Sequence, residues 1–123
     1  MTEQCSITDK HCAPCGGGNI ALEPAAVKKF MTELHGDWQV SADFKKISRD
    51  FNFKNYYQTM AFVNAIAWMA HAEGHHPDLE VGYNHCLVNY NTHAIDGLSE
   101  NDFICAAKVD ALREMQPEKT NGK

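Results

Sequence analysis

The period of the hydrophobic positions changes along the chain, and each change marks an expected element. After Pro24, a residue suited to the first turn of a helix, hydrophobic residues recur at helical spacing, and Gly36 is a natural stop. From Asp37 the period becomes two, so that residues 38–44 and 47–53 each present one apolar face. We therefore expect a helix and then two strands, joined by a short lysine-rich turn into a hairpin.

The same order follows in the second half of the chain. Asn55, with Gln58 three residues later, resembles a capping box that opens a helix, and Gly74 ends that helix. Its apolar stripe is wide, so we expect it to be the central buried helix. Alternation returns over 79–83 and again over 86–92, which predicts a second pair of strands.

A last helix completes the pattern. Ser99 and Asp102 form another capping box, and apolar residues recur at helical spacing as far as Met115. Because the order is α-β-β-α-β-β-α, we predict an α+β fold with one four-stranded antiparallel sheet and helices packed on one face. The chain divides into a polar leader over 1–22, a single domain over 23–116 and a polar tail over 117–123.

Composition and charge narrow the function. The 123 residues are 44% hydrophobic and 22% charged, which is typical of a globular domain, and the net charge of −5 argues against binding a nucleic-acid backbone. No apolar run is long enough to cross a membrane, and the first ten residues lack the apolar stretch of a secretory signal. We expect a cytoplasmic protein without nucleic-acid or membrane partners.

Seven histidines and five cysteines are many for a chain of this length. In a reducing compartment the cysteines are most simply free thiols. Cys12 and Cys15 form a C-x-x-C, but no strand precedes it and no second ligand pair follows nearby; Cys5 and His11 supply only a loose local constellation. We interpret this segment as a flexible leader without essential metal or redox chemistry.

The densest chemical signal is the segment 71–77, which carries three imidazoles at a junction between a helix and a strand. His71 and His75 are four residues apart, as in zinc sites on helices, although Gly74 is expected to unwind the helix between them. Imidazole also exchanges protons near neutrality, so these residues together with His93 suit acid–base chemistry without a metal.

Other candidates have simpler explanations. Spacing places Trp38 in the core, and Asp102 is explained as the helix-capping partner of Ser99. For His71 two interpretations stay open, a functional residue of the site or an ordinary surface histidine. No Ser or Cys lies in a nucleophile motif, so covalent catalysis is unsupported. Three histidines are interpreted as ordinary surface residues: His11, His35 and His85.

Several motifs, taken in order, resemble a known family. They are His75-His76-Pro77-Asp78-Leu79, Val81-x-Tyr83-Asn84, Thr92-His93 and Gly97-Leu98-Ser99-x-x-Asp102. Together they resemble the pterin-4a-carbinolamine dehydratases, a family also called dimerisation cofactor of a homeodomain transcription factor. The resemblance covers roughly residues 20–115.

The resemblance implies an activity and a set of site residues. The reaction is removal of water from 4a-hydroxytetrahydropterin to give quinonoid dihydropterin, which regenerates the pterin used by aromatic amino acid hydroxylases, with no metal or organic cofactor. The family's catalytic histidines fall on His75, His76 and His93. Its pocket tryptophan falls on Trp38 and its motif aspartate on Asp102, and contacts to the pterin are also expected from His71, Pro77 and Thr92.

We expect His75 and His93 to transfer protons and His76 to orient the substrate. The sequence departs from the family's pattern at His71, where an acid is common, and at Ala94 and Asp96, where an acid and a glycine are common. The family also implies a homo-oligomer, a dimer or a tetramer. Two alternatives remain: a non-catalytic protein-binding module of the same fold, which in animals partners a transcription factor, and a small zinc-binding protein.

Overall fold

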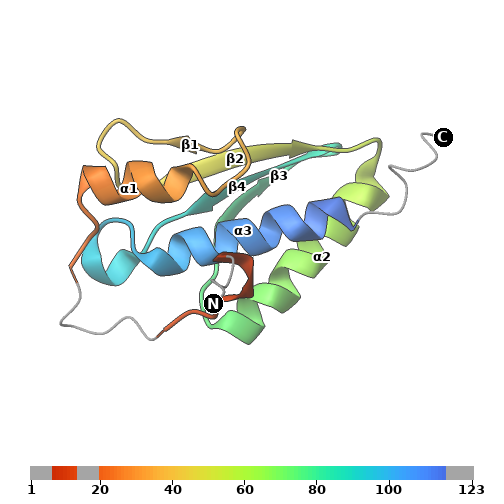
Figure 1. Ribbon diagram of the computed structural model, residues 1–123. Helices are drawn as coiled ribbons and strands as arrows, with labels where there is room; N and C mark the ends of the chain where they lie inside the picture. The colour runs from red at the N-terminus through yellow and green to blue at the C-terminus, as the bar shows by residue number, and fades with distance from the viewer. Residues whose placement is uncertain (1–6, 14–19, 116–123) are drawn as a thin grey trace.

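The computed structural model describes residues 7–13 and 20–115. Over these residues, the chain forms one four-stranded sheet with three α-helices on one face (Figure 1). In chain order the elements are η1 (Ile7–Asp9), α1 (Pro24–Met31), β1 (Gln39–Val40), β2 (Ile47–Asn52), α2 (Tyr56–Glu73), β3 (Asp78–Val81), β4 (His85–Tyr90), η2 (His93–Ile95) and α3 (Glu100–Glu114).

The strand order is β1-β2-β4-β3, and every neighbouring pair is antiparallel. The predicted hairpin and the predicted second pair of strands are therefore confirmed. They join through β2 and β4, which pair from Ile47 opposite Tyr90 to Asn52 opposite His85. This confirms the α+β class, with helices on one side. Because β3 and β4 are antiparallel, the start of β3 and the end of β4 lie at the same end of the sheet, with Asp78 opposite Asn89.

The central helix is α3, and the expectation that α2 would be the buried one is wrong. Eight of the fifteen residues of α3 are buried, and the helix lies between α1 and α2 (Figure 1). In α2 one stripe packs inward, while Trp68 is 75% and Tyr57 79% exposed. The apolar residues of α2 thus cover two faces, of which only one meets the domain. No helix in the described ranges is both long and apolar enough to span a membrane.

The first strand is also shorter than predicted. Alternation over 38–44 indicated a strand, yet β1 ends at Val40. The Ser41 hydroxyl accepts hydrogen bonds from the backbone N–H groups of Lys45 and Lys46, which closes a turn, and Phe44 takes a left-handed conformation with φ of 59°. Short-range bonds from a serine side chain replace the ladder there.

The predicted start and end of α2 are confirmed. Asn55 accepts a hydrogen bond from the backbone of Gln58, which caps the first turn. Gly74 ends the helix in the left-handed conformation, with φ of 68°, where a side chain would be strained. The chain therefore leaves the helical path immediately before His75.

Residues 7–13, which we call the N-terminal strap, pack against α3 and the end of α2. Ile7 is buried in the core, and the Lys108 ammonium donates to the carbonyl oxygen of Thr8 at 2.7 Å. Asn101 clamps Ala13 by donating to its carbonyl oxygen at 2.7 Å and accepting from its N–H at 3.0 Å. The expectation of a flexible leader is therefore wrong for this segment, while Cys5 and Cys15 lie outside the described residues.

A buried ion pair ties β2 to α3. The side chains of Arg49 and Asp110 are only 10% and 18% exposed, and the Arg49 Nη1 donates to Asp110 Oδ1 at 2.7 Å. The indole N–H of Trp38 donates to the same carboxylate at 2.8 Å. The guanidinium also lies 4.2 Å from the centre of the Phe51 ring. One carboxylate of α3 thus holds groups from two other segments in place.

Replacing this carboxylate should destabilise the fold strongly. In Asp110→Ala we expect the free energy of unfolding to fall by about 3 kcal/mol, because the Arg49 cation is left buried without its main partner. Chemical denaturation measures the change. Lys45→Ala, which breaks the exposed pair of Lys45 with Asp96, is the control and should leave stability nearly unchanged. Equal effects of the two variants would contradict the importance of this pair.

Candidate active site

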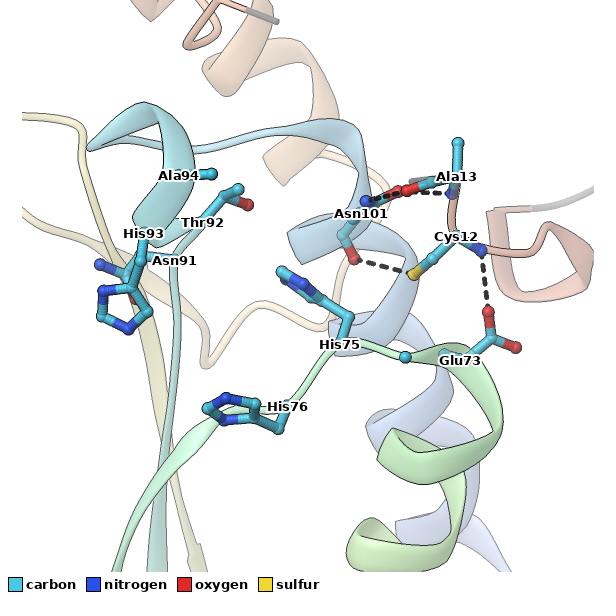
Figure 2. A pocket seen from close by; sticks show the side chains of 11 residues that line it. Cys12, Ala13, Glu73, His75, His76, Asn91, Thr92, His93, Ala94 and Asn101 are labelled. Carbon is cyan, nitrogen blue, oxygen red and sulfur yellow. Dashed lines mark hydrogen bonds between the residues drawn. The ribbon is translucent and has the colours of Figure 1, made fainter. Parts of the chain in front are cut away.

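The antiparallel pairing of β3 and β4 brings two histidine segments together. His75 and His76 lie between α2 and β3, and His93 begins η2, just beyond the end of β4. All three imidazoles line one cavity of about 470 Å³ (Figure 2). The full lining is Cys12, Ala13, Glu73, Gly74, His75, His76, Asn91, Thr92, His93, Ala94 and Asn101.

His75 is the most firmly held of the three. Its Nε2 lies 2.6 Å from Oδ1 of Asp102, a carboxylate that is fully buried. Its ring also stacks on the ring of Tyr90, with centroids 5.6 Å apart and planes within 13°. Because a carboxylate only accepts hydrogen bonds, the contact places a proton on Nε2 and leaves Nδ1 for other chemistry.

Asp102 serves the helix and the site at once. Its other oxygen, Oδ2, accepts hydrogen bonds from the backbone N–H of Ser99 at 2.9 Å and from the Thr92 hydroxyl at 2.8 Å. The predicted capping box is confirmed, and the same carboxylate holds His75. A buried negative charge is tolerable because charge-assisted hydrogen bonds surround it.

The environment of His75 raises its pKa. Burial acts to lower it, but the hydrogen bond and the charge of Asp102 outweigh burial, so the pKa lies above its ordinary value. At neutral pH a larger fraction of His75 therefore carries a second ring proton than in a free imidazole. Such a group can act as a proton donor.

His76 and His93 are more open to solvent. The Nδ1 of His76 donates to the carbonyl oxygen of Pro77 at 3.2 Å, which leaves Nε2 free. His93 has a side chain 71% exposed, and its Nε2 lies 3.9 Å from a carboxylate oxygen of Asp78. In Figure 2, His75 and His76 approach the cavity from the end of α2, and His93 approaches it from η2.

The structure does not bring every expected residue to this cavity. Trp38 is buried in the core, as its spacing predicted, and its indole N–H donates to Asp110. His71 and Pro77 line a second cavity of about 450 Å³, which shares His75 and His76 with the first. His71 lies beside the Trp68 ring, 6.3 Å between centroids. Of the expected substrate contacts, Thr92 lines the first cavity and Asp102 stands directly behind His75.

The spacing of His71 and His75 suggested a zinc site on one helix, but α2 ends before His75. Gly74 turns the chain between His71 and His75, so the two do not continue along one helix. Within the ranges 7–13 and 20–115, no three His, Cys, Asp or Glu side chains are grouped as metal ligands.

The N-terminal strap forms one wall of the cavity through Cys12 and Ala13, which the sequence did not predict. Glu73 accepts hydrogen bonds from the backbone N–H of Cys12 at 2.8 Å and from the His11 Nδ1 at 2.9 Å. Burial acts to raise the pKa of Glu73, but these bonds and the nearby Lys108 lower it overall. Because the segment was interpreted as a flexible leader, no contact between it and Asn101 or Glu73 was expected.

Comparison with known proteins identifies the family. The profile described as "Pterin 4 alpha carbinolamine dehydratase" matches residues 20–112. A protein of Nitrosomonas europaea is 61% identical over 91% of this chain and 97% of its own length, and one of Legionella pneumophila (strain Corby) is 55% identical over 86% and 94%. Both carry the provisional name pterin-4-alpha-carbinolamine dehydratase.

Solved structures agree. A crystal structure described as a transcriptional coactivator/pterin dehydratase from Brucella melitensis is 28% identical, with a TM-score of 0.71 over 75% of this chain and 97% of that one. A pterin dehydratase-like protein described as a RuBisCO assembly factor in the alpha-carboxysome is 29% identical, with a TM-score of 0.56 over 63% and 90%. The chain belongs to the pterin 4 alpha carbinolamine dehydratase family, which confirms the resemblance and the class of enzyme.

Removing the charge behind His75 should lower the pKa of that histidine. In Asp102→Asn the negative charge that raises the pKa of His75 is gone while burial remains, so this pKa falls. We also expect the free energy of unfolding to fall by about 2 kcal/mol. Nuclear magnetic resonance titration of the His75 ring measures the pKa. Asp50→Asn, at the exposed pair of Asp50 with His85, is the matched control and should leave the His75 titration unchanged.

The same pair gives stability a defined pH dependence. A raised pKa in the folded state means that the pair stabilises the native chain in full below the ordinary histidine pKa of about 6.5. That contribution is lost as pH rises through the higher folded pKa. The difference in unfolding free energy between the parent chain and Asp102→Asn should therefore shrink as pH rises across this window. A difference that grows with pH would contradict this assignment.

Proposed function

We propose that this chain removes water from 4a-hydroxytetrahydropterin, giving quinonoid dihydropterin, by histidine acid–base catalysis. The observation that supports it most is the Asp102-held His75 beside His76 and His93 in one cavity. Family membership supplies the substrate class, and the cavity supplies groups suited to the proton transfers.

The reaction needs one proton donor and one proton acceptor. Protonated His75 donates its Nδ1 proton to the 4a-hydroxyl oxygen, and the C4a–O bond breaks to release water. His93 takes the proton from N5 of the pterin, so that the N5–C4a double bond forms. The two histidines then exchange protons with solvent. Each transfer contributes roughly 10²–10⁴-fold to the rate.

His76 has a different part in this proposal. Its Nδ1 is occupied by the Pro77 carbonyl, and Pro77 restricts the backbone of His76 to extended conformations. The free Nε2 is therefore held in one direction, which suits binding and orientation of the pterin. Asn91 also lines the cavity and offers a further polar group.

Only protons and a hydroxyl group move in this reaction, so we propose that it requires no metal and no organic cofactor. We place the enzyme in the cytoplasm, where it supports pterin recycling for an aromatic amino acid hydroxylase. We also propose a homo-oligomer, a dimer or a tetramer. Exposed aromatic residues on α2, such as Trp68 and Tyr57, support association through an apolar face.

A protein-binding role on the same fold is the alternative. The pterin dehydratase-like protein reported above is described as a RuBisCO assembly factor, so the fold also occurs in a protein with an assembly role. The buried pair of Asp102 and His75 favours the enzyme here. Burying a carboxylate against an imidazole costs desolvation energy, and a binding module has no use for the raised pKa that results.

Single histidine variants should separate the three roles. We expect His75→Ala and His93→Ala each to lower kcat by 10²–10⁴-fold, and His76→Ala mainly to raise KM. His35→Ala, which removes an exposed imidazole outside the cavity, is the matched control and should keep full activity. Steady-state kinetics with the 4a-carbinolamine measure all four. If His76→Ala lost the most turnover, the proposed roles would be wrong.

An assay coupled to phenylalanine hydroxylase tests the activity itself. Adding this chain should speed the disappearance of the 4a-carbinolamine generated by the hydroxylase. Once the hydroxylase has formed the 4a-carbinolamine, a metal chelator is added together with the chain. The acceleration by the chain should then be unchanged. No acceleration by the folded chain would overturn the proposed function, and loss of activity with chelator would overturn the metal-free mechanism.

A further inference from the structure

Two cysteines that the proposed function does not use lie side by side near the cavity. Cys12, in the N-terminal strap, and Cys105, in α3, have their sulfur atoms 3.4 Å apart. We propose that this thiol pair is a redox modification site, in which a peroxide oxidant forms a Cys12–Cys105 disulfide that fastens the strap to α3. The inference is independent of the proposed activity.

The two sulfur atoms are held together by bonds that do not involve sulfur. The backbone N–H of Cys12 is bonded to Glu73 at the end of α2, and the following residue, Ala13, is clamped by Asn101 on α3. Cys105 lies one helical turn beyond Asn101, in the most buried helix of the domain. Only a small approach separates a 3.4 Å contact from a disulfide bond of about 2.05 Å.

An oxidant can reach the pair through the cavity. Cys12 is half-buried and lines the cavity, whereas Cys105 is fully buried behind it. Cys86, by contrast, is fully buried in β4, where burial raises its pKa to about 11. A thiol of that kind reacts slowly with peroxide because little thiolate is present.

The electrostatics of the pair favour a thiolate. The hydrogen bond from Cys12 lowers the pKa of Cys105 against the effect of burial, and the charge of His75 acts in the same direction. The same bond and burial raise the pKa of Cys12. Cys12 therefore holds the shared proton and Cys105 carries the thiolate, which can act as a base toward Cys12; a thiolate is the nucleophile that peroxide requires.

The chemistry balances with hydrogen peroxide as the only added reagent. The Cys105 thiolate takes the proton of Cys12, and the Cys12 sulfur, which lines the cavity, attacks one peroxide oxygen; the O–O bond breaks, leaving a Cys12 sulfenic acid and hydroxide, which becomes water after proton uptake. The Cys105 sulfur then attacks the Cys12 sulfur, forming S–S and breaking S–O to release a second water. Two thiols lose two electrons and two protons, and peroxide is reduced.

The bond would close a long loop. The two residues are 93 positions apart, and cross-links across long loops restrict the unfolded chain strongly. The strap also lies outside residues 20–112, the part that matches the family profile. Oxidation would thus make a segment beyond the family match a fixed wall of the cavity.

Peptide mapping of the oxidised full-length chain tests the proposal. After treatment with hydrogen peroxide and blocking of free thiols, digestion without reductant should yield a cross-linked peptide containing Cys12 and Cys105. Its mass should be two hydrogens below the summed masses of the two reduced peptides. The oxidised chain should unfold several degrees higher, and dithiothreitol should reverse both changes. Cys86→Ala and Cys15→Ser should retain the cross-link, and Cys12→Ser should abolish it.

Two results would overturn the inference. One is a peptide in which Cys12 is joined to Cys15, its partner in the C-x-x-C, as the main product. The other is irreversible oxidation of Cys12 with Cys105 still free. Cys12→Ser lies on the strap rather than in the buried core, so its test does not depend on whether a Cys105 variant folds.

Discussion

The buried Asp102 carboxylate is the interaction on which the site depends. Its oxygens reach the first turn of α3, the hydroxyl of Thr92 beyond β4, and the ring of His75 beyond α2. The start of α3 and the segments that follow β4 and α2 therefore converge on one charge that cannot be left unpaired in the core. Because the same group caps a helix and sets the pKa of His75, the stability of the fold and the protonation of the cavity are coupled.

Sheet topology does the rest of the assembly. Antiparallel pairing of β3 with β4 places the start of one strand beside the end of the other, so His76 and His93 face a shared space. The opposite wall comes from the N-terminal strap, which Glu73 and Asn101 hold. A site on a rigid sheet end, closed by a separately anchored segment, combines histidines in fixed positions with a wall that the proposed oxidation of Cys12 would alter.

Local rules predicted the elements well where nearby residues decide them. The caps at Asn55 and Ser99 and the stop at Gly74 depend on hydrogen bonds or backbone freedom within a few residues, and the structure has all three. Prediction was wrong where an apolar pattern had more than one explanation. Phe44 continued an alternation but lies in a turn, and Trp68 widened an apolar stripe yet faces outward, because periodicity does not distinguish a core face from an exposed one.

By itself the sequence determined the α+β order, both ends of α2, the start of α3, the family and the three histidines that share a cavity, since these depend on local spacing and on residue identity, whereas α1 ends at Met31 and not at the expected Gly36. Tertiary structure decided which histidine is bonded to Asp102, that Trp38 serves the core through Asp110, and that Cys12 meets Cys105. Those contacts join residues that are dozens of positions apart. Burial and strand register create them, and neither can be read from the spacing of residues along the chain.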